Sequence, residues 1–545
     1  MNIFEIINKK EYEDLAVIND GKKLYTIKQL KRLINPIIKR LTADKIKNVL
    51  IVSKSHFDFV VNFLAAVFSQ KNIILFTDSK KIHTLKTDYI LLDKTESEEI
   101  YDIAEETAYS EPDYAKTFVT LFTSGSTGIP KAIRKNFLNL FAETNDLIFE
   151  IKNNFLKQDS RLQIVTSATA YHMYGFIYWF FIVLCDCKNF ILNTDEIIYP
   201  DRAELKYSIF ISTPSFLEEY KKYDVAIDNP PHLIFTAGDK LKKEVQEYFK
   251  QFNTKIIEIY GSTETGTIAY RYQNDYYQCF KNVEISTDET SQIIIKSPYF
   301  MEKELTLCDT VQILNSREFY LGQRTDKIVK IQEKRVNTEE IENILEDTDL
   351  IDSSYCFKHR DKLACAAVLN NNGKLLYTDK QNGGRQAVIK YLKNFIKDKS
   401  EVVPQKWKFL YEIPRTQRGK IDKNKIENFF NTNISLPLVL NHKRSDNTAE
   451  YELIFSKNCN FFDGHFKDYP VLPGVIQLYF AHAFAAKAFK RNVFESPVKK
   501  IKFSHIIKPD EKIKLKLHLN GKNIHYGYEY NDIIYSSGVF EAEEL

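Results

Sequence analysis

The segment LFTSGSTGIPK, from Leu121 to Lys131, carries a strand end into a loop of serine, threonine and glycine that closes on a lysine. Glycine lets backbone amides approach an anion, hydroxyl groups donate to phosphate oxygens, and Lys131 supplies positive charge. These features predict a phosphate-binding loop, with a polar surface turn as the alternative. The lysine follows no glycine and precedes no Ser or Thr, which excludes the P-loop of kinases and GTPases. The candidate phosphate ligands before the lysine are Thr123, Ser124, Gly125, Ser126, Thr127 and Gly128.

Short apolar runs rich in β-branched residues alternate with amphipathic helical stretches from the start of the chain to about residue 325. This alternation is typical of parallel α/β layers. The runs lead into Ser, Thr, Gly or Asp, so polar groups gather at the carboxyl ends of strands, where open α/β sheets bind ligands. The clearest runs are NVLIVSKS from Asn48, NIILFTD from Asn72, YSIFISTPS from Tyr207, HLIFTAGDKL from His232 and KIIEIYGSTE from Lys255.

The length of the chain, its charge and its longest apolar run exclude several classes of protein. A chain of 545 residues exceeds what one hydrophobic core usually supports, so at least two domains are expected. The 76 basic and 73 acidic side chains are mixed along the chain and leave a net charge of +3, which argues against nucleic-acid binding. The longest apolar run, YGFIYWFFIVLC from Tyr174 to Cys185, is too short for a membrane span and predicts a buried helix.

The N-terminus and the cysteines bear on location. The opening MNIFEIINKKEYEDLAV lacks the charged start, apolar stretch and small-residue cleavage site of a secretion signal. The seven cysteines include no C-x-x-C pair. Together these features predict a cytoplasmic protein with neither zinc nor a disulfide framework.

The pattern changes twice after the first 325 residues, so we expect an α/β chain of three domains. A large domain spans 1–325, and a small α+β domain with a charged start spans 326–430. The stretch NTNISLPLVL from Asn431 combines turn formers with proline and predicts a linker. The last domain, 431–545, contains one apolar helix at about 474–490 and then four strand-like runs, which predicts a helix wrapped by antiparallel strands.

Further motifs follow the phosphate loop in order. They are Asn139, AYHMYG from Ala170, IYGSTET from Ile259, Asp309, Arg324, Asp326 and PRTQRGKID from Pro414. With the phosphate loop, they resemble the adenylate-forming superfamily of acyl-CoA synthetases, peptide-synthetase adenylation domains and luciferases. The resemblance covers roughly residues 1 to 430, and chance matches do not chain in this order.

The resemblance implies roles around ATP, a carboxylic acid and a thiol. Lys420 neutralises charge as the carboxylate attacks the α-phosphate, and Glu264 holds Mg²⁺, which prefers hard oxygen ligands. Asp326 is the hinge about which the small domain rotates, so that Lys420 leaves before a thiol arm enters. The family's nucleotide-binding positions fall on the phosphate loop, Lys131, Tyr260, Thr263, Asp309 and Arg324, and its acyl pocket on His172, Met173, Tyr174, Ala237 and Gly238.

One position departs from the family pattern. Glu333 stands where family members usually carry a glycine, in the loop that lines the thiol-acceptor tunnel after rotation. A larger, charged side chain there would narrow the tunnel or repel the thiol acceptor. The sequence therefore supports adenylation more firmly than the thioester step.

The last domain has a resemblance of its own. FFDGHFKDYPVLPGVIQ, from Phe461 to Gln477, is similar to the hotdog-fold hydroxyacyl-carrier-protein dehydratases. That resemblance implies His465 as the catalytic base and the Gly474 N–H, at a helix N-terminus, as donor to the thioester carbonyl. The family carries Glu or Asp where Tyr479 stands, and a phenol is a weaker acid than a carboxylic acid. His482 offers a substitute, and a degenerate acyl-binding or dimerising domain is the alternative.

The sequence therefore predicts an ATP- and Mg²⁺-dependent ligase that passes an acyl group to a phosphopantetheine thiol. No carrier-protein motif occurs in the linker region, so an acyl carrier protein is expected to act in trans, and a homodimer is expected through the hotdog domain. The fusion looks like loading enzymes of aryl-polyene pigment pathways, although fold-level analogy leaves aryl and fatty acids open. The alternatives are an acyl-CoA synthetase that uses free CoA and a non-catalytic acyl-binding scaffold.

Overall fold

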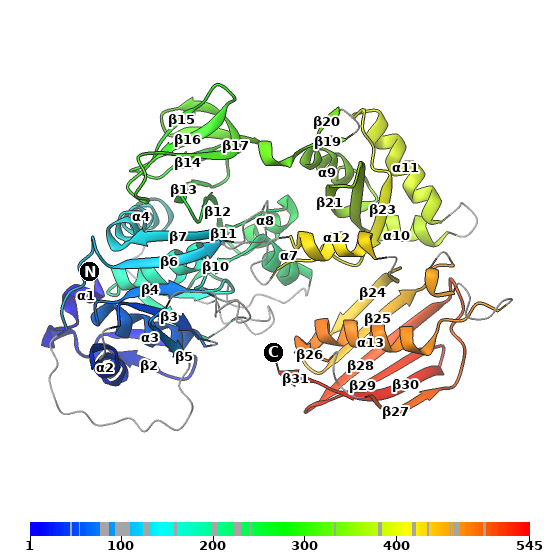
Figure 1. Cartoon of the computed structure of the whole chain (residues 1–545), viewed down its shortest axis with the longest axis horizontal. Helices are drawn as coiled ribbons and strands as arrows, with labels where there is room; N and C mark the ends of the chain where they lie inside the picture. Colours follow the sequence, from blue (N-terminus) through cyan, green and yellow to red (C-terminus); the bar gives the residue numbers. More distant parts are fainter. Residues whose placement is uncertain are drawn as a thin grey trace. The chain divides into compact units, whose positions relative to one another are not determined.

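The protein is described here by a computed structural model. It describes residues 1–43, 46–53, 55–76, 87–92, 109–123, 131–156, 161–195, 197, 205, 208–222, 230–239, 241–331, 334–379, 384–416, 421–432, 435–457, 459–462, 469–493 and 498–544. Met1–Thr325 forms one compact unit, and Asp326–Thr416 with Ile421–Leu545 forms a second (Figure 1).

The first unit contains a five-stranded sheet that carries the phosphate-loop segment. Its order is β5 (Tyr89–Leu92), β3 (Asn48–Val52), β4 (Asn72–Leu75), β6 (Phe118–Thr123), β7 (Lys131–Asn136) over the described residues. The first four strands are parallel, and β7 returns antiparallel to β6 with Lys131 opposite Thr123. The predicted loop therefore joins the two strands of a hairpin.

A larger sheet, of thirteen strands over the described residues, completes the first unit. Its parallel part is β1 (Ala16–Asn19), β9 (Phe190–Asn193), β8 (Leu162–Thr166), β10 (Ser208–Ser212), β11 (Leu233–Ala237) and β12 (Lys255–Ser262), with β2 (Leu24–Thr26) antiparallel at the β1 edge. Its antiparallel part is β13 (Gly266–Arg271), β14 (Tyr277–Cys279), β18 (Glu318–Arg324), β17 (Leu305–Asn315), β16 (Gln292–Lys296) and β15 (Glu284–Thr287).

The prediction of parallel layers is confirmed for most strands up to β12, where β2 and β7 alone run antiparallel among the described strands, and it is wrong beyond β12. A parallel connection needs a crossover of a dozen or more residues. Only Thr263–Thr265 separate β12 from β13, so the chain turns back on itself and continues as antiparallel strands.

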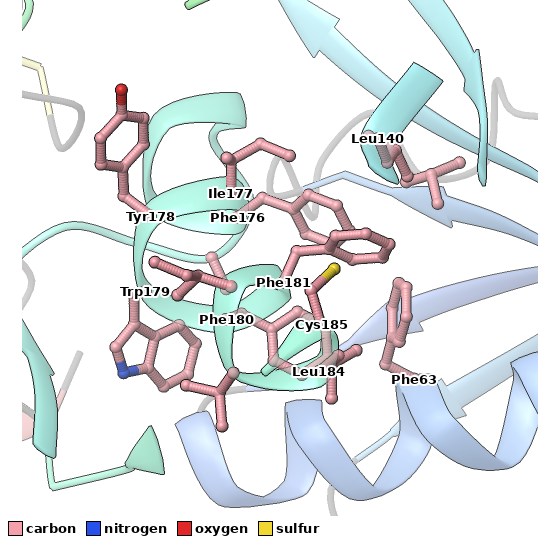
Figure 2. Close-up of a cluster of buried hydrophobic side chains, with 14 of the residues drawn as sticks. Phe63, Leu140, Phe176, Ile177, Tyr178, Trp179, Phe180, Phe181, Leu184 and Cys185 are labelled. Carbon is pink, nitrogen blue, oxygen red and sulfur yellow. The ribbon is translucent and has the colours of Figure 1, made fainter. Parts of the chain in front are cut away.

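Helices pack on these sheets. They are α1 (Ile3–Ile6), η1 (Lys10–Tyr12), α2 (Ile27–Ala43), α3 (His56–Phe68), α4 (Phe137–Glu150), η3 (Ile151–Phe155), α5 (Met173–Gly175), η4 (Phe176–Phe181), α6 (Ile182–Cys185), α7 (Pro214–Lys222) and α8 (Lys243–Lys250). The apolar run Tyr174–Cys185 is helical as predicted and is buried from Gly175 onward, with η4 a π-helical stretch between two α-helical pieces (Figure 2). Phe180 packs edge-on to Phe63 at 4.8 Å between ring centroids, and the Trp179 indole donates to the Asn193 carbonyl at 2.8 Å. Among the described residues, no helix is long and apolar enough to cross a membrane.

The second unit begins with the small α+β part. It contains η6 (Thr325–Lys327, at the boundary), hairpin β19 (Ile328–Ile331) and β20 (Lys334–Asn337), the sheet β21 (Ile351–His359), β22 (Lys362–Leu369) and β23 (Lys406–Leu410), and helices α9 (Thr338–Glu346), α10 (Asn371–Thr378), α11 (Arg385–Lys397) and α12 (Lys423–Asn431). The predicted linker is partly wrong, because Asn431 still belongs to α12 and Leu438 already begins the next strand. The side chains of Leu436 and Leu438 pack in hydrophobic clusters. This packing explains why β24 begins within the predicted linker.

The hotdog domain follows in the same unit. Helix α13 (Gly474–Phe489) lies across the antiparallel sheet β24 (Leu438–Arg444), β25 (Thr448–Ile454), β28 (Lys512–Asn520), β29 (Asn523–Tyr530), β30 (Ile533–Glu541), β27 (Val498–Phe503), with the short elements η7 (Asn460–Phe462), β26 (Arg491–Asn492) and β31 (Glu543–Glu544) (Figure 1). The helix and the last four long strands confirm the prediction. The two strands before the helix were not predicted, since β24 is mostly polar and carries few strand signals.

Candidate active site

The structure describes the two residues that flank the predicted phosphate loop. Thr123 ends β6 and Lys131 begins β7, while Ser124, Gly125, Ser126, Thr127 and Gly128 lie outside the described residues. Lys131 is exposed, and its Nζ lies 3.9 Å from Glu264 Oε1. The structure thus brings the lysine of the loop to the glutamate of the IYGSTET motif, two residues that the sequence separates by 133 positions.

The turn between β12 and β13 holds Thr263 and Glu264. Ser262 and Thr265 close it from both ends, because each backbone N–H donates to the other residue's hydroxyl, at 3.0 and 3.1 Å. Gly261 is required there, since a Cβ atom would meet the Gly266 carbonyl oxygen at 2.2 Å. The two motif side chains between these anchors stay partly exposed, as ligand-binding groups must.

Asp309 and Arg324 form a cross-strand ion pair. They are register partners on β17 and β18, and Arg324 Nη1 lies 3.2 and 3.4 Å from the two Asp309 oxygens. The Asp309 carboxylate is buried, whereas Arg324 is half exposed. Burial raises the pKa of the nearby Tyr260 phenol, and the Asp309 charge raises it further. Tyr260 is held by ring contacts with Tyr277 and Phe319. Three predicted nucleotide-binding residues therefore lie together.

The predicted acyl-pocket residues lie at the carboxyl ends of the parallel strands. Ala237 ends β11, and Gly238 follows it with a positive φ of 102° that favours glycine. His172 precedes α5, which contains the buried Met173 and the partly buried Tyr174. Burial raises the pKa of the Tyr174 phenol well above its usual range, and the backbone of Ser212, at the end of β10, opposes that shift. Ala237 and Gly238 therefore lie at the carboxyl end of a parallel strand, and the acyl-pocket role of all five residues stays a prediction.

Several predicted residues lie outside the described part of the chain: Lys420, His465 and Glu333. Their roles stay predictions. Asp326 is described, and the division between the two compact units falls directly before it.

The N-terminal end of α13 carries the predicted hotdog residues. Gly474 is the first helical residue, and a Cβ atom there would lie 2.6 Å from the Phe503 ring. Tyr479 is 40% exposed. By contrast, Phe480, Phe484 and Ala488 of the same helix are buried in the core. Burial lowers the pKa of His482, and its ring lies 4.2 Å from that of Phe540. These contacts identify His482 as a packed side chain, which weakens it as a substitute acid.

Sequence reasoning missed two buried polar groups. Gln477 donates to the Leu472 carbonyl at 3.0 Å and accepts from the Ser536 hydroxyl at 2.6 Å. On α4, a polar stripe that continues from the predicted Asn139 at helical spacing is buried rather than solvated, and its missed members are Glu143, Asp146 and Glu150. The available signal was three carboxylates spaced 3, 4 and 7 residues apart directly after the phosphate loop, a pattern that usually marks a surface face.

Comparison with known proteins agrees with this geometry. Residues 24–292 match the AMP-binding enzyme family, and residues 441–539 match the ApeI-like family, described as ApeI dehydratase. A putative long chain fatty acid-CoA ligase of Staphylococcus haemolyticus is 23% identical over 341 residues, covering 57% of this chain and 69% of the relative. A D-alanine–D-alanyl carrier protein ligase of Streptococcus pyogenes is 23% identical over 367 residues, covering 56% and 69%.

Solved structures give the same fold. A benzoate CoA ligase from Burkholderia xenovorans superposes with a TM-score of 0.62 at 16% identity, covering 78% of this chain and 100% of its own. The o-succinylbenzoate coenzyme A synthetase of Bacillus subtilis, in complex with AMP, gives 0.61 at 14% identity, covering 78% and 98%.

The chain thus joins a domain of the AMP-binding, adenylate-forming ligase family to an ApeI-like domain of hotdog fold. It is accordingly an enzyme of the adenylate-forming acid–thiol ligase class.

Proposed function

We propose that this enzyme activates a carboxylic acid with ATP as an acyl-adenylate and passes the acyl group to a phosphopantetheine thiol on an acyl carrier protein. The observation that carries the nucleotide site is the meeting of Asp309, Arg324 and Tyr260 on one side, and of Lys131 with Glu264 on the other. In this proposal Asp309 accepts the ribose hydroxyls, because only a carboxylate offers two anionic acceptors.

The chemistry has two displacements. A substrate carboxylate oxygen bonds to the α-phosphorus, and the bond from that phosphorus to the bridging oxygen breaks, releasing pyrophosphate. The thiol sulfur then bonds to the acyl carbon, AMP leaves, and the thiol proton passes to solvent. Lys420 and Lys131 balance the negative charge that develops on the phosphates in the first step. The second step needs Lys420 to withdraw, for which a hinge at Asp326 is the proposed means.

Mg²⁺ fits this site if the protein and the phosphates of ATP share its coordination. No group of three or more His, Cys, Asp or Glu that could hold a metal occurs among the described residues, so a site made only of protein is not available there. Mg²⁺ commonly binds one or two carboxylates together with substrate phosphates, and Glu264 is a partly exposed carboxylate 3.9 Å from Lys131. When bound, the ion would neutralise phosphate charge.

The acceptor is proposed to be a carrier protein supplied in trans. The fusion to an ApeI-like domain supports this, as does the likeness to carrier protein ligases. The test is acyl transfer by the purified enzyme to holo-acyl carrier protein and, separately, to CoA, followed by mass spectrometry. Faster loading of the carrier protein is expected. Faster thioester formation with CoA would make the enzyme an acyl-CoA synthetase.

The hotdog domain is proposed to bind carrier-linked acyl chains and to pair with a second copy. Support comes from exposed apolar side chains on the sheet edge β27 and beside the start of α13: Val475, Tyr479, Ile501, Phe503 and Ile506. A Phe503→Glu variant is expected to shift the mass measured by light scattering from dimer to monomer. A monomeric wild-type chain would exclude pairing. Water loss from a 3-hydroxyacyl carrier protein, absent in His465→Ala, would make the domain a dehydratase.

A further inference from the structure

Helix α4 connects the phosphate-loop hairpin to the turn that carries Glu264. It begins directly after β7, where Asn136 and Asn139 cap it reciprocally. Its buried polar stripe then contacts the antiparallel part of the large sheet. Asp146 accepts from the Asn282 backbone N–H at 3.0 Å and from the Tyr299 hydroxyl at 2.6 Å.

Glu143 makes the contact nearest to the turn. Its Oε1 accepts the Thr267 backbone N–H at 2.7 Å, one residue after β13 begins. Its Oε2 lies 4.0 Å from Lys135 Nζ, and both side chains are almost fully buried. Lys135 itself donates to the Tyr299 carbonyl at 2.7 Å. A buried carboxylate carries a large desolvation cost, which the Thr267 hydrogen bond and the nearby Lys135 charge offset in part.

The backbone at the turn is shaped around this carboxylate. Gly266 has a φ of +72°, and a Cβ atom there would lie 2.3 Å from Glu143 Oε2. Glu143 therefore fills the space that any other residue at 266 would occupy. Because Thr265 and Ser262 lock the remainder of the turn, fixing its end at Thr267 also fixes Glu264.

Charge couples the same groups. Burial raises the pKa of the Glu143 carboxyl, and Lys135 opposes that shift. Burial lowers the pKa of Lys135, while the charges of Glu143, Glu302 and Glu264 oppose this lowering. Lys135 is therefore paired electrostatically with Glu143, the carboxylate that it approaches most closely.

We infer that Glu143 is a positioning residue for nucleotide binding, which anchors the turn 262–266 to helix α4 and so holds Glu264 opposite Lys131. This inference rests on the proposed function, because the turn matters for nucleotide binding only if Glu264 holds Mg²⁺ there. Glu143 touches neither nucleotide nor acid and acts through the backbone of Gly266 and Thr267.

The test compares Glu143→Ala with Glu150→Ala. Glu150 lies on the same buried face and accepts the Tyr270 hydroxyl at 3.0 Å, on the same strand β13 but further from the turn. When a hydrogen bond to a charged group supports a binding site, its loss typically weakens affinity about tenfold or more. We expect Glu143→Ala to weaken MgATP binding, measured by calorimetry, about tenfold, and to raise the Mg²⁺ concentration needed. Glu150→Ala is expected to bind MgATP like wild type.

A conservative variant separates positioning from folding. Glu143→Gln keeps an oxygen that accepts the Thr267 N–H, and is expected to recover most of the affinity, with the KM for the carboxylic acid unchanged throughout. Equal weakening by Glu143→Ala and Glu150→Ala would overturn the inference. So would unchanged MgATP affinity in Glu143→Ala. Binding is read independently of turnover, so a wild-type chain that binds MgATP but activates no acid would refute the proposed function alone.

Discussion

Asp309→Asn should weaken nucleotide binding with little loss of fold. Asparagine keeps the size of aspartate and one acceptor oxygen but removes the negative charge. The Asp309–Arg324 pair, at 3.2 and 3.4 Å, would lose the charge of its acceptor, and the proposed ribose contacts would keep one neutral acceptor in place of two anionic ones.

The magnitude follows from exposure and charge. Arg324 is 43% exposed, so water screens the pair, and its loss should cost about 1 kcal/mol of unfolding free energy or less. Hydrogen bonds from ribose to a charged, buried acceptor contribute more, about 1.5–3 kcal/mol, which corresponds to a rise in the KM for ATP of roughly ten- to a hundredfold.

The assay is ATP–pyrophosphate exchange at varied ATP concentration, with Glu258→Gln as the matched control. Glu258 pairs with Arg271 across β12 and β13 at 2.8 and 3.2 Å, an equivalent cross-strand pair in the same sheet. The control should lose a similar amount of stability and keep its KM for ATP. An Asp309→Asn enzyme whose KM for ATP stays within about twofold of wild type would refute the reasoning.

Three further predictions concern stability, read by fluorine NMR of fluorotryptophan-labelled chain, in which Trp179 reports on the first unit and Trp407 on the second. Phe180→Ala removes a fully buried ring and should destabilise the first unit by about 3–5 kcal/mol, whereas a loss below about 1 kcal/mol would mean that the cluster in Figure 2 is loosely packed. Burial raises the pKa of Glu342 to about 7, so the folded second unit holds a proton that the unfolded chain releases above about 4.5; its stability should fall by roughly 3 kcal/mol as pH rises through that window, and Glu342→Gln should abolish the slope. Gln477→Leu leaves a buried hydroxyl and a carbonyl without their partner and should cost the second unit about 2 kcal/mol in urea titration; an unchanged midpoint would show that these bonds contribute nothing.

Much of the fold could be predicted, because hydrophobic periodicity and the residues at the ends of helices and strands depend on the local sequence. Strands such as β3, β10 and β11 are apolar runs with clear ends, and α13 is an apolar helix with a proline before it. The antiparallel continuation after β12 could not be read from periodicity, since it depends on a three-residue turn that leaves no room for a crossover.

The candidate site was predictable where a motif carries its chemistry within a few residues. Asp309 and Arg324 were placed by motif order, and the register of β17 and β18 joins them. Glu143 was not predictable, because its role depends on a backbone N–H that lies 124 residues further along the chain. A carboxylate at helical spacing carries the same signal whether solvent or a strand faces it.

The most direct measurement is acid-dependent ATP–pyrophosphate exchange by the full chain against aryl, cinnamic and medium-to-long fatty acids, with Lys420→Ala beside wild type. The account predicts exchange with one of these classes, which would also name the substrate, and a loss of about a hundredfold or more in Lys420→Ala, because preorganised charge at the α-phosphate drives the step. Full exchange in Lys420→Ala, or none in wild type with any acid, would contradict it.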